Sequence, residues 1–373
     1  MSRYLPTAIC YNFVMKTGSF LLVFLAAAVF CRPAAAGKPG FPVCMYGIGM
    51  PEELAVLKQA GFNCFQTYAP DPGKLAMLAA EAEKQGLMML AFPDAVIGSA
   101  YSGAARKWPM LAWYLVDEPE TFRMPPGELE KINRRVKDWD PGRNTAFVVG
   151  QGTAAFAYGG IADILMVDWY PVPHLKLESL GAQVSLITEA AKKTDLNNAD
   201  KPVWAVLQAF DWLDFPQLRN PPVGGFPTFG EIRFMTYLAV ARGARGLFYY
   251  RLRDKDGKPL YDQPERWETF ERVVGEISAL LPALESGVRF PPPPGLAPGL
   301  EAKCFSSGGR KFMILLNPSE AMEPLDTAVL SGWRPLFEEK GDLAELFPAT
   351  DGRSRMPGYR VLVLEKRRRF VFF

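Results

Sequence analysis

The sequence predicts an α/β protein, a (β/α)8 TIM barrel followed by a small C-terminal all-β domain. After residue 40 the chain repeats one plan, in which a short apolar run is followed by a turn and then by a helical pattern. This alternation is typical of a parallel sheet covered by helices. Eight such units lie between residues 40 and 288, which agrees with the length of about 250 residues typical of a barrel. Beyond residue 299 the helical period disappears.

The strands and helices are expected in strict alternation. The apolar runs that predict strands occupy 42–48, 62–68, 87–92, 110–116, 145–149, 164–167, 202–207 and 246–250. The helical patterns follow at 51–60, at 72–85, just before Trp108, and at 126–139, 152–158, 180–193, 229–243 and 264–284. Gly61 and Gly86 come after the first two helices, where glycine commonly ends a helix. An open doubly wound sheet is the rival architecture, but Gly47-Ile48-Gly49 lacks the third glycine of its usual first turn.

A change of composition marks the end of the barrel. Residues 289–299 are rich in proline, which is typical of a stiff linker. Apolar runs at 300–317, 328–333 and 359–364, separated by turn residues, predict a small β-sandwich-like domain over 300–373. We expect the basic run 366–369 to be a solvated strand edge.

The first 36 residues predict a signal peptide. Lys16 precedes an apolar run at 20–30 that is too short to span a bilayer, and Ala34-Ala35-Ala36 suits signal peptidase. Cleavage after Ala36 would give a secreted or periplasmic chain without a stable membrane span. That chain keeps Cys44, Cys64 and Cys304, an odd number that excludes a full disulfide framework. Cys44 and Cys64 are compatible with small core residues.

The composition excludes several classes of function. The net charge is +2, with 42 basic and 40 acidic residues, so neither nucleic acid nor an anionic membrane is indicated as a partner. The single histidine, His174, argues against a multi-histidine metal site and against a histidine-containing triad. No cofactor or metal is implied. Acid–base chemistry in this chain would therefore rest on carboxylates.

Acidic and aromatic side chains follow many of the predicted strands. In (β/α)8 barrels function gathers at the C-terminal ends of the strands. The candidates at these positions are Tyr46, Tyr68, Asp94, Asp117, Glu118, Asp168, Trp169, Tyr170, Gln208, Asp211, Trp212 and Tyr250. Such a rim suits a sugar, because aromatic faces stack on its CH groups and acidic side chains accept hydrogen bonds from its hydroxyls.

The sharpest motif is Trp113-Tyr114-Leu115-Val116-Asp117-Glu118-Pro119, in which a buried strand runs into two acids. Charges beside a barrel core are costly, so their presence needs a reason. The functional interpretation makes Glu118 a general acid/base and gives Asp117 the role of orienting it or a substrate hydroxyl. The alternative is that both acids pair with basic neighbours or cap the next helix.

Asp117-Glu118-Pro119 resembles the motif of the clan-A glycoside hydrolases, in which the acid/base glutamate ends strand four, commonly within Asn-Glu-Pro. The resemblance covers about residues 40–285 and implies a hydrolase of oligo- or polysaccharides. Asp117 replaces the asparagine that usually contacts the hydroxyl next to the reacting carbon. The nucleophile of the clan is a glutamate that ends strand seven, where this sequence has Gln208, and an amide cannot act as that nucleophile.

A second carboxylate must therefore come from elsewhere. The available acids are Asp168, Asp211, Asp94 and Glu231, of which we expect Asp168 and Asp211 to belong to the site; Glu231 could merely complement a helix dipole. The expected substrate contacts are Asp117, Tyr46, Tyr68, Trp169, Tyr170, Gln208, Trp212 and Tyr250. Gln208 favours the alternative hypothesis, a carbohydrate-binding barrel that does not cleave its ligand. A role in envelope assembly has no specific support in the sequence.

Overall fold

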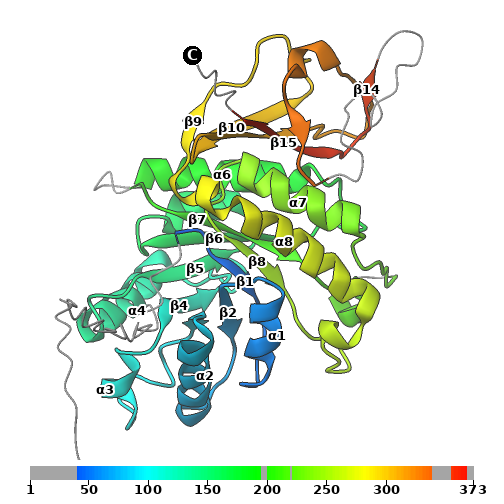
Figure 1. The fold of residues 1–373 in the computed structure, drawn as a ribbon. Coiled ribbons are helices and arrows are strands. Elements are labelled where there is room, and N and C mark those ends of the chain that lie inside the picture. Colours follow the sequence, from blue (N-terminus) through cyan, green and yellow to red (C-terminus); the bar gives the residue numbers. More distant parts are fainter. Residues whose placement is uncertain (1–39, 195–199, 219–220, 338–353, 368–373) are drawn as a thin grey trace, which may run out of the picture. The chain divides into compact units, whose positions relative to one another are not determined.

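The computed structural model describes residues 40–194, 200–218, 221–337 and 354–367. Its centre is a closed barrel of parallel strands in the order β1 to β8, with β1 hydrogen-bonded to β8 (Figure 1). The strands are β1 (Val43–Met45), β2 (Cys64–Thr67), β3 (Met88–Ala91), β4 (Met110–Asp117), β5 (Thr145–Val149), β6 (Ile164–Trp169), β7 (Val203–Gln208) and β8 (Leu247–Tyr250). The predicted barrel is confirmed.

Helices follow the strands and lie outside the barrel (Figure 1). They are α1 (Glu53–Gln59), α2 (Pro72–Gln85), α3 (Ser102–Ala105), α4 (Pro126–Trp139), α5 (Ala155–Tyr158), α6 (Ser179–Thr194), α7 (Phe229–Ala241) and α8 (Pro264–Ser286). Helix α2 shows why the sequence gives these bounds. The Asp71 side chain accepts a hydrogen bond from Lys74 N at 2.7 Å, Pro72 occupies the first turn, and Gly86 ends the helix at φ 67°.

The side chains of the barrel strands divide between two apolar layers. Alternate residues point to opposite faces of a strand, so Cys44 and Tyr46 of the first strand region face the interior while Val43 and Met45 face the helices. The interior layer also contains Leu90, Tyr114, Val148, Met166, Trp204, Val206 and Phe248. The interior is thus packed with side chains, and the space for a ligand lies at the mouth of the barrel.

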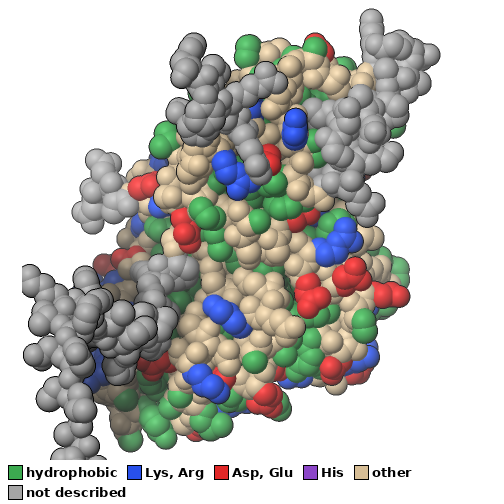
Figure 2. All heavy atoms as spheres, viewed as in Figure 1, with side chains coloured by type: hydrophobic (Ala, Val, Ile, Leu, Met, Phe, Trp, Pro, Cys, Tyr) green, Lys and Arg blue, Asp and Glu red, His purple; other side chains and the backbone are tan. Residues whose placement is uncertain are grey.

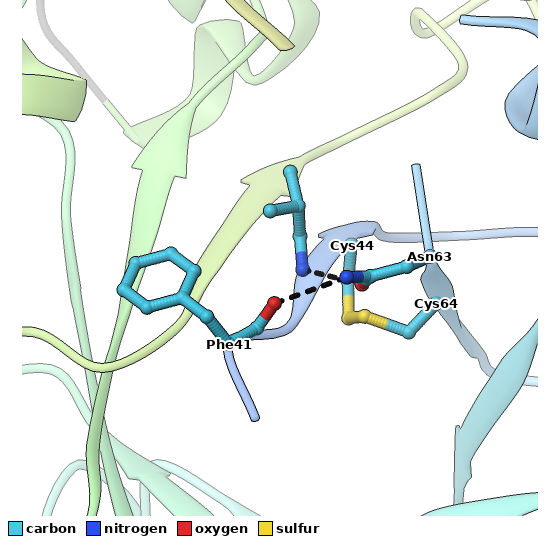
Figure 3. Close-up of a disulfide and its surroundings, with 5 residues drawn as sticks. Phe41, Cys44, Asn63 and Cys64 are labelled. Carbon is cyan, nitrogen blue, oxygen red and sulfur yellow. Dashed lines mark hydrogen bonds between the residues drawn. A yellow bond between two sulfur atoms is a disulfide. The ribbon is translucent and has the colours of Figure 1, made fainter. Parts of the chain in front are cut away.

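A disulfide joins Cys44 to Cys64 inside the barrel (Figure 3). The parallel register of β1 and β2 pairs these residues directly, with their Cα atoms 4.6 Å apart, which is within the range of disulfides. The side chain of Asn63, the residue before β2, also joins these two strands, because it accepts a hydrogen bond from Val43 N at 2.7 Å. The prediction that Cys44 and Cys64 are small core residues is therefore incomplete. Both are buried, and they are also joined by a disulfide. Cys304 remains a buried thiol.

Removing this disulfide is expected to destabilise the barrel. The bond closes a loop with a sequence separation of 20, and a loop of this size corresponds to about 3 kcal/mol of unfolding free energy. The double variant Cys44→Ala/Cys64→Ala should unfold at a lower denaturant concentration than the parent. Reductant should lower the midpoint of the parent and leave that of the double variant unchanged. Equal midpoints for both proteins without reductant would contradict the bond.

The C-terminal part of the chain is built mainly from strands, as predicted, but the strand predicted at 328–333 is wrong, because a short 3-10 helix occupies Thr327–Leu330. A five-stranded antiparallel sheet has the order β13-β15-β11-β10-β9, and a two-stranded sheet pairs β12 with β14. The strands are β9 (Val288–Phe290), β10 (Glu301–Ser307), β11 (Arg310–Leu316), β12 (Glu323–Pro324), β13 (Arg334–Pro335), β14 (Arg355–Met356) and β15 (Val361–Arg367). Strand β9 thus includes Arg289 and Phe290, the first residues of the predicted linker.

One face of the five-stranded sheet packs against the barrel helices. Phe305, Phe312 and Val363 belong to the same apolar cluster as the helix layer. Arg233 of α7 donates hydrogen bonds to Glu276 of α8 and to Val361 O of β15, at 2.8 Å each. The sheet therefore continues the core of the barrel instead of forming a separate module.

The predicted signal peptide lies outside the described residues, as do Arg368 and Arg369 of the basic run. Lys366 donates a hydrogen bond to Ser331 O at 3.0 Å. Within the described ranges, no helix has the length and apolar character needed to cross a bilayer.

Candidate active site

Two cavities meet at the C-terminal mouth of the barrel, each of about 220 Å³. They share four lining residues, Glu118, Asp168, Tyr170 and Trp212. The first cavity is also lined by Tyr46, Tyr68, Asp117, Val148, Val206, Phe210, Phe215, Leu218 and Tyr250. The second is also lined by Thr121, Gly150, Gln151, Trp169 and Leu175. The structure therefore brings most of the predicted site residues together, with Glu118 and Asp168 at the junction of the two cavities.

Glu118 stands at the first position after β4. Its backbone N donates to Val148 O of β5 at 3.1 Å, and its φ is 42°, in the left-handed region that glutamate rarely adopts. Such strain costs about 1–3 kcal/mol and tends to occur at functional sites. A Cβ atom on Gly150 would lie 3.2 Å from the carboxyl carbon of Glu118. The bare backbone at Gly150 thus leaves room for the Glu118 carboxyl.

Glu120 fixes the loop that contains Gly150. Its Oε1 accepts hydrogen bonds from Gly150 N at 2.6 Å and Gln151 N at 3.1 Å. Burial raises the pKa of Glu120, and these backbone hydrogen bonds oppose that rise. Glu120 and Gly150 are not predicted from the sequence, since neither belongs to a recognisable pattern and their contact joins segments that follow two different strands.

Asp168 ends the buried part of β6 and is only 8% exposed. Burial raises its pKa well above the usual value, and the nearby charge of Glu118 and a hydrogen bond with that side chain raise it further, while Tyr170 opposes the rise. Its Oδ1 has no hydrogen-bond partner among the described residues. Burial and these neighbouring charges therefore favour the protonated, neutral form of Asp168.

Asp117 is the third acid at the mouth. Its Oδ1 accepts a hydrogen bond from the Tyr114 hydroxyl at 2.7 Å. Burial raises the pKa of Asp117, the Tyr114 hydrogen bond lowers it, and the charge of Glu118 raises it. Among the described residues, Asp117, Glu118 and Asp168 form no ion pair with lysine or arginine. The helix that follows, α4, begins after Pro125 without a side-chain cap. Among the described residues, these acids therefore neither pair with basic side chains nor cap the next helix.

Aromatic rings surround these acids. The rings of Tyr170 and Tyr250 stack with centroids 5.6 Å apart, and the ring of Tyr46 meets that of Tyr250 edge-on at 5.8 Å. Burial raises the pKa of the Tyr46 and Tyr170 hydroxyls well above the usual value. They therefore stay neutral and able to donate hydrogen bonds. The Trp169 indole donates instead to Ser179 Oγ at 2.8 Å, which orients its ring beside the second cavity.

Gln208 has a different role from the one expected of a substrate contact. It is fully buried; its Nε2 donates to Val172 O at 2.7 Å and to Phe210 O at 3.1 Å, and its Oε1 accepts from Val172 N at 2.9 Å. Gln208 therefore holds the loop after β6 and does not line either cavity. A glutamate could not donate these two hydrogen bonds, which explains the amide at this position.

The other candidate acids lie away from the two cavities. Asp211 Oδ1 accepts hydrogen bonds from Leu213 N and Gly225 N, both at 2.9 Å, and so ties two parts of one loop together. Asp94 is exposed and lies 3.7 Å from Arg135. Glu231 forms a capping box with Thr228 at the start of α7, as its alternative interpretation required. Asp168 is therefore the acid that the geometry places beside Glu118.

The barrel resembles that of solved glycoside hydrolases. No protein-family model matches this sequence, and the search of curated proteins gives no match. A structure described as a glycoside hydrolase is 13% identical, with a TM-score of 0.57 over 87% of this chain and 92% of that chain. A family 5 glycoside hydrolase from Bacteroides vulgatus is also 13% identical, with a TM-score of 0.56 over 87% and 89%. An alpha-amylase from Anoxybacillus is 11% identical, with a TM-score of 0.52 over 89% and 99%. The chain therefore shares the fold of these glycoside hydrolases.

Proposed function

We propose that the protein hydrolyses glycosidic bonds in an oligo- or polysaccharide, with Glu118 and Asp168 as its catalytic carboxyl groups. The observation that carries the proposal is that both acids line the two cavities at the barrel mouth, among aromatic rings and without a basic partner in the described part of the chain. Glycoside hydrolysis needs two carboxyl groups, one protonated and one ionised. Asp168, whose pKa is raised by burial, would supply the protonated group, and Glu118 would supply the second carboxyl group.

The burial of the two side chains supports a division of roles between them. Asp168 is the more buried and its pKa is raised well above the usual value, so it holds the proton that acid catalysis needs. Asp168 then protonates the leaving oxygen while Glu118 attacks the anomeric carbon and the glycosidic bond breaks. Water, deprotonated by Asp168, hydrolyses the glycosyl–Glu118 ester. This assignment exchanges the roles that the clan-A motif suggested, and it makes Glu118 the nucleophile.

A glycosyl–Glu118 intermediate implies retention of configuration. Inverting enzymes hold their carboxyl groups about 6.5–9.5 Å apart to admit a water molecule, whereas retaining enzymes hold them about 5–5.5 Å apart. Glu118 and Asp168 line the same two cavities, and the proposal expects their carboxyl groups to have the spacing of a retaining enzyme. The tyrosines at the mouth would stack on the sugar and donate hydrogen bonds to it.

A secreted or periplasmic location is part of the proposal. The predicted leader at 1–36 supports it, and so does the disulfide between Cys44 and Cys64, because such bonds persist mainly in oxidising compartments.

The proposal is tested by incubating the protein with a panel of oligosaccharides and polysaccharides and measuring new reducing ends. We expect release with at least one glycan, with the first-formed product keeping its anomeric configuration by NMR. Binding of a glycan without release would support the alternative, a carbohydrate-binding barrel that does not cleave its ligand.

Gly150→Ala is expected to lower kcat on such a substrate by about 10- to 100-fold, because displacing a reacting group by about 1 Å can cost 100-fold. The added methyl group would press on the Glu118 carboxyl. Gly142→Ala is the matched control, since a Cβ atom there meets nothing within 4 Å. Equal kcat values for both variants would show that Gly150 does not position Glu118.

A further inference from the structure

Another cavity, polar and of about 470 Å³, lies at the end of the barrel opposite the mouth. The ends of α6 and α7, the start of β7, and strands β9 and β10 surround it (Figure 1). Its lining includes six basic side chains, from Lys192, Lys201, Arg242, Arg245, Arg289 and Lys303. Among the described lining residues the only carboxylate is that of Asp200. Figure 2 shows one face of the molecule, on which lysine and arginine side chains are interspersed with acidic ones.

Part of this positive charge is neutralised within the protein. Arg245 pairs with Asp200, and Arg242 pairs with Glu301 of β10. Within the described ranges, no carboxylate lies at ion-pair distance from Lys192, Arg289 or Lys303. Three cations from three different elements therefore face one cavity without a counter-charge.

Lys303 is the most buried of these three. Its Nζ donates to Val240 O at 2.9 Å and to Ala241 O at 3.2 Å, at the C-terminal end of α7. An ammonium group has three N–H donors, so one remains for a ligand. Burial first, and then the charges of Arg289 and Lys192, lower the pKa of Lys303 to about 8. A bound anion would offset both effects.

We propose that this cavity binds an oxyanion, the phosphate or sulfate group of a ligand, held between Lys192, Arg289 and Lys303. Paired N–H donors of arginine and lysine suit such groups. The rest of the lining is small or aliphatic and offers no aromatic ring for stacking a sugar. The volume exceeds that of one phosphate and falls within the usual range for small-molecule sites. The proposal does not depend on the function assigned to the barrel mouth.

Calorimetric titration with inorganic phosphate, pyrophosphate and sulfate tests this, with sodium chloride at equal ionic strength as the reference. We expect pyrophosphate to bind, and Lys303→Met to weaken binding about 10-fold, the loss expected for one charge-assisted hydrogen bond. Lys192→Met changes an exposed side chain on α6 and should weaken binding without affecting the fold. Lys131→Met, exposed on α4, is the matched control and should bind like the parent.

The bound phosphate group can belong to a lipid headgroup or to a soluble ligand, and binding to vesicles distinguishes the two. Co-sedimentation with phosphatidylglycerol vesicles but not with phosphatidylcholine vesicles, lost in Lys192→Met, would indicate a lipid-borne phosphate. Pyrophosphate binding without vesicle binding would indicate a soluble ligand. Binding no tighter than that of chloride, or equal affinities in Lys192→Met, Lys303→Met and Lys131→Met, would overturn the proposed site.

Discussion

Glu118→Gln is expected to lower kcat by at least about 10³-fold, a loss typical of removing a nucleophile. The amide has nearly the shape of the carboxyl and fits beside Gly150, but it cannot form the glycosyl ester. The loss should be equally severe on a natural glycoside and on an aryl glycoside with a good leaving group, because both need the nucleophile. Initial rates on both substrates, together with circular dichroism to confirm folding, provide the measurement.

Asp94→Asn is the matched control for Glu118→Gln. Asp94 also follows a barrel strand, but its side chain is 67% exposed and lies outside both cavities. We expect its kcat to equal that of the parent. Hydrolysis that survives Glu118→Gln at the parental rate would remove Glu118 from the mechanism.

The barrel could be predicted from the sequence because its pattern is local and repeated. Each apolar run is short enough for a strand, each helical pattern follows a turn, and the count of eight closes a barrel. The same topology gathers the residues that follow the strands at one mouth. Asp168 and Glu118 are 50 positions apart in sequence, yet both follow from this rule.

The roles of individual side chains could not be predicted in the same way. Gln208 follows a strand as a site residue would, but its amide holds the loop after β6, and only the fold of that loop shows this. Asp211 likewise accepts a hydrogen bond from Gly225 N, 14 positions further along the chain. No short sequence pattern predicts that this loop brings the two residues together. The Cys44–Cys64 bond depends on the register of β1 and β2, which spacing alone does not fix.

Asp168→Asn is expected to lower kcat/KM much more for substrates with poor leaving groups than for substrates with good ones. A natural glycoside needs a proton on the departing oxygen, so its kcat/KM should fall by about 10²–10⁴-fold, the usual contribution of a general acid. An aryl glycoside with a good leaving group needs no proton, and its kcat/KM, which reports the first step, should stay within about 10-fold of the parent. The opposite pattern, in which Glu118→Gln alone spares the aryl glycoside, would restore Glu118 as the acid.

The same variant is expected to be more stable than the parent at neutral pH. The pKa of Asp168 is raised in the folded chain, mainly by burial and then by Glu118, whereas in the unfolded chain it is about 3.9. Between these two pKa values the folded state binds more protons than the unfolded state, so the free energy of unfolding falls as pH rises through that window. Asparagine does not titrate, so the variant lacks this dependence on pH.

Thermal unfolding of the parent and Asp168→Asn between pH 4 and pH 8 provides the measurement. Near pH 4 the two proteins should differ least, because Asp168 is then protonated in the folded state. At pH 7–8 the variant should unfold at least about 2 °C higher, the shift that roughly 1 kcal/mol gives a chain of this size. A Tm difference that does not change with pH would mean that Asp168 has the same protonation in both states, and the proton that the proposed mechanism places on Asp168 would then be absent.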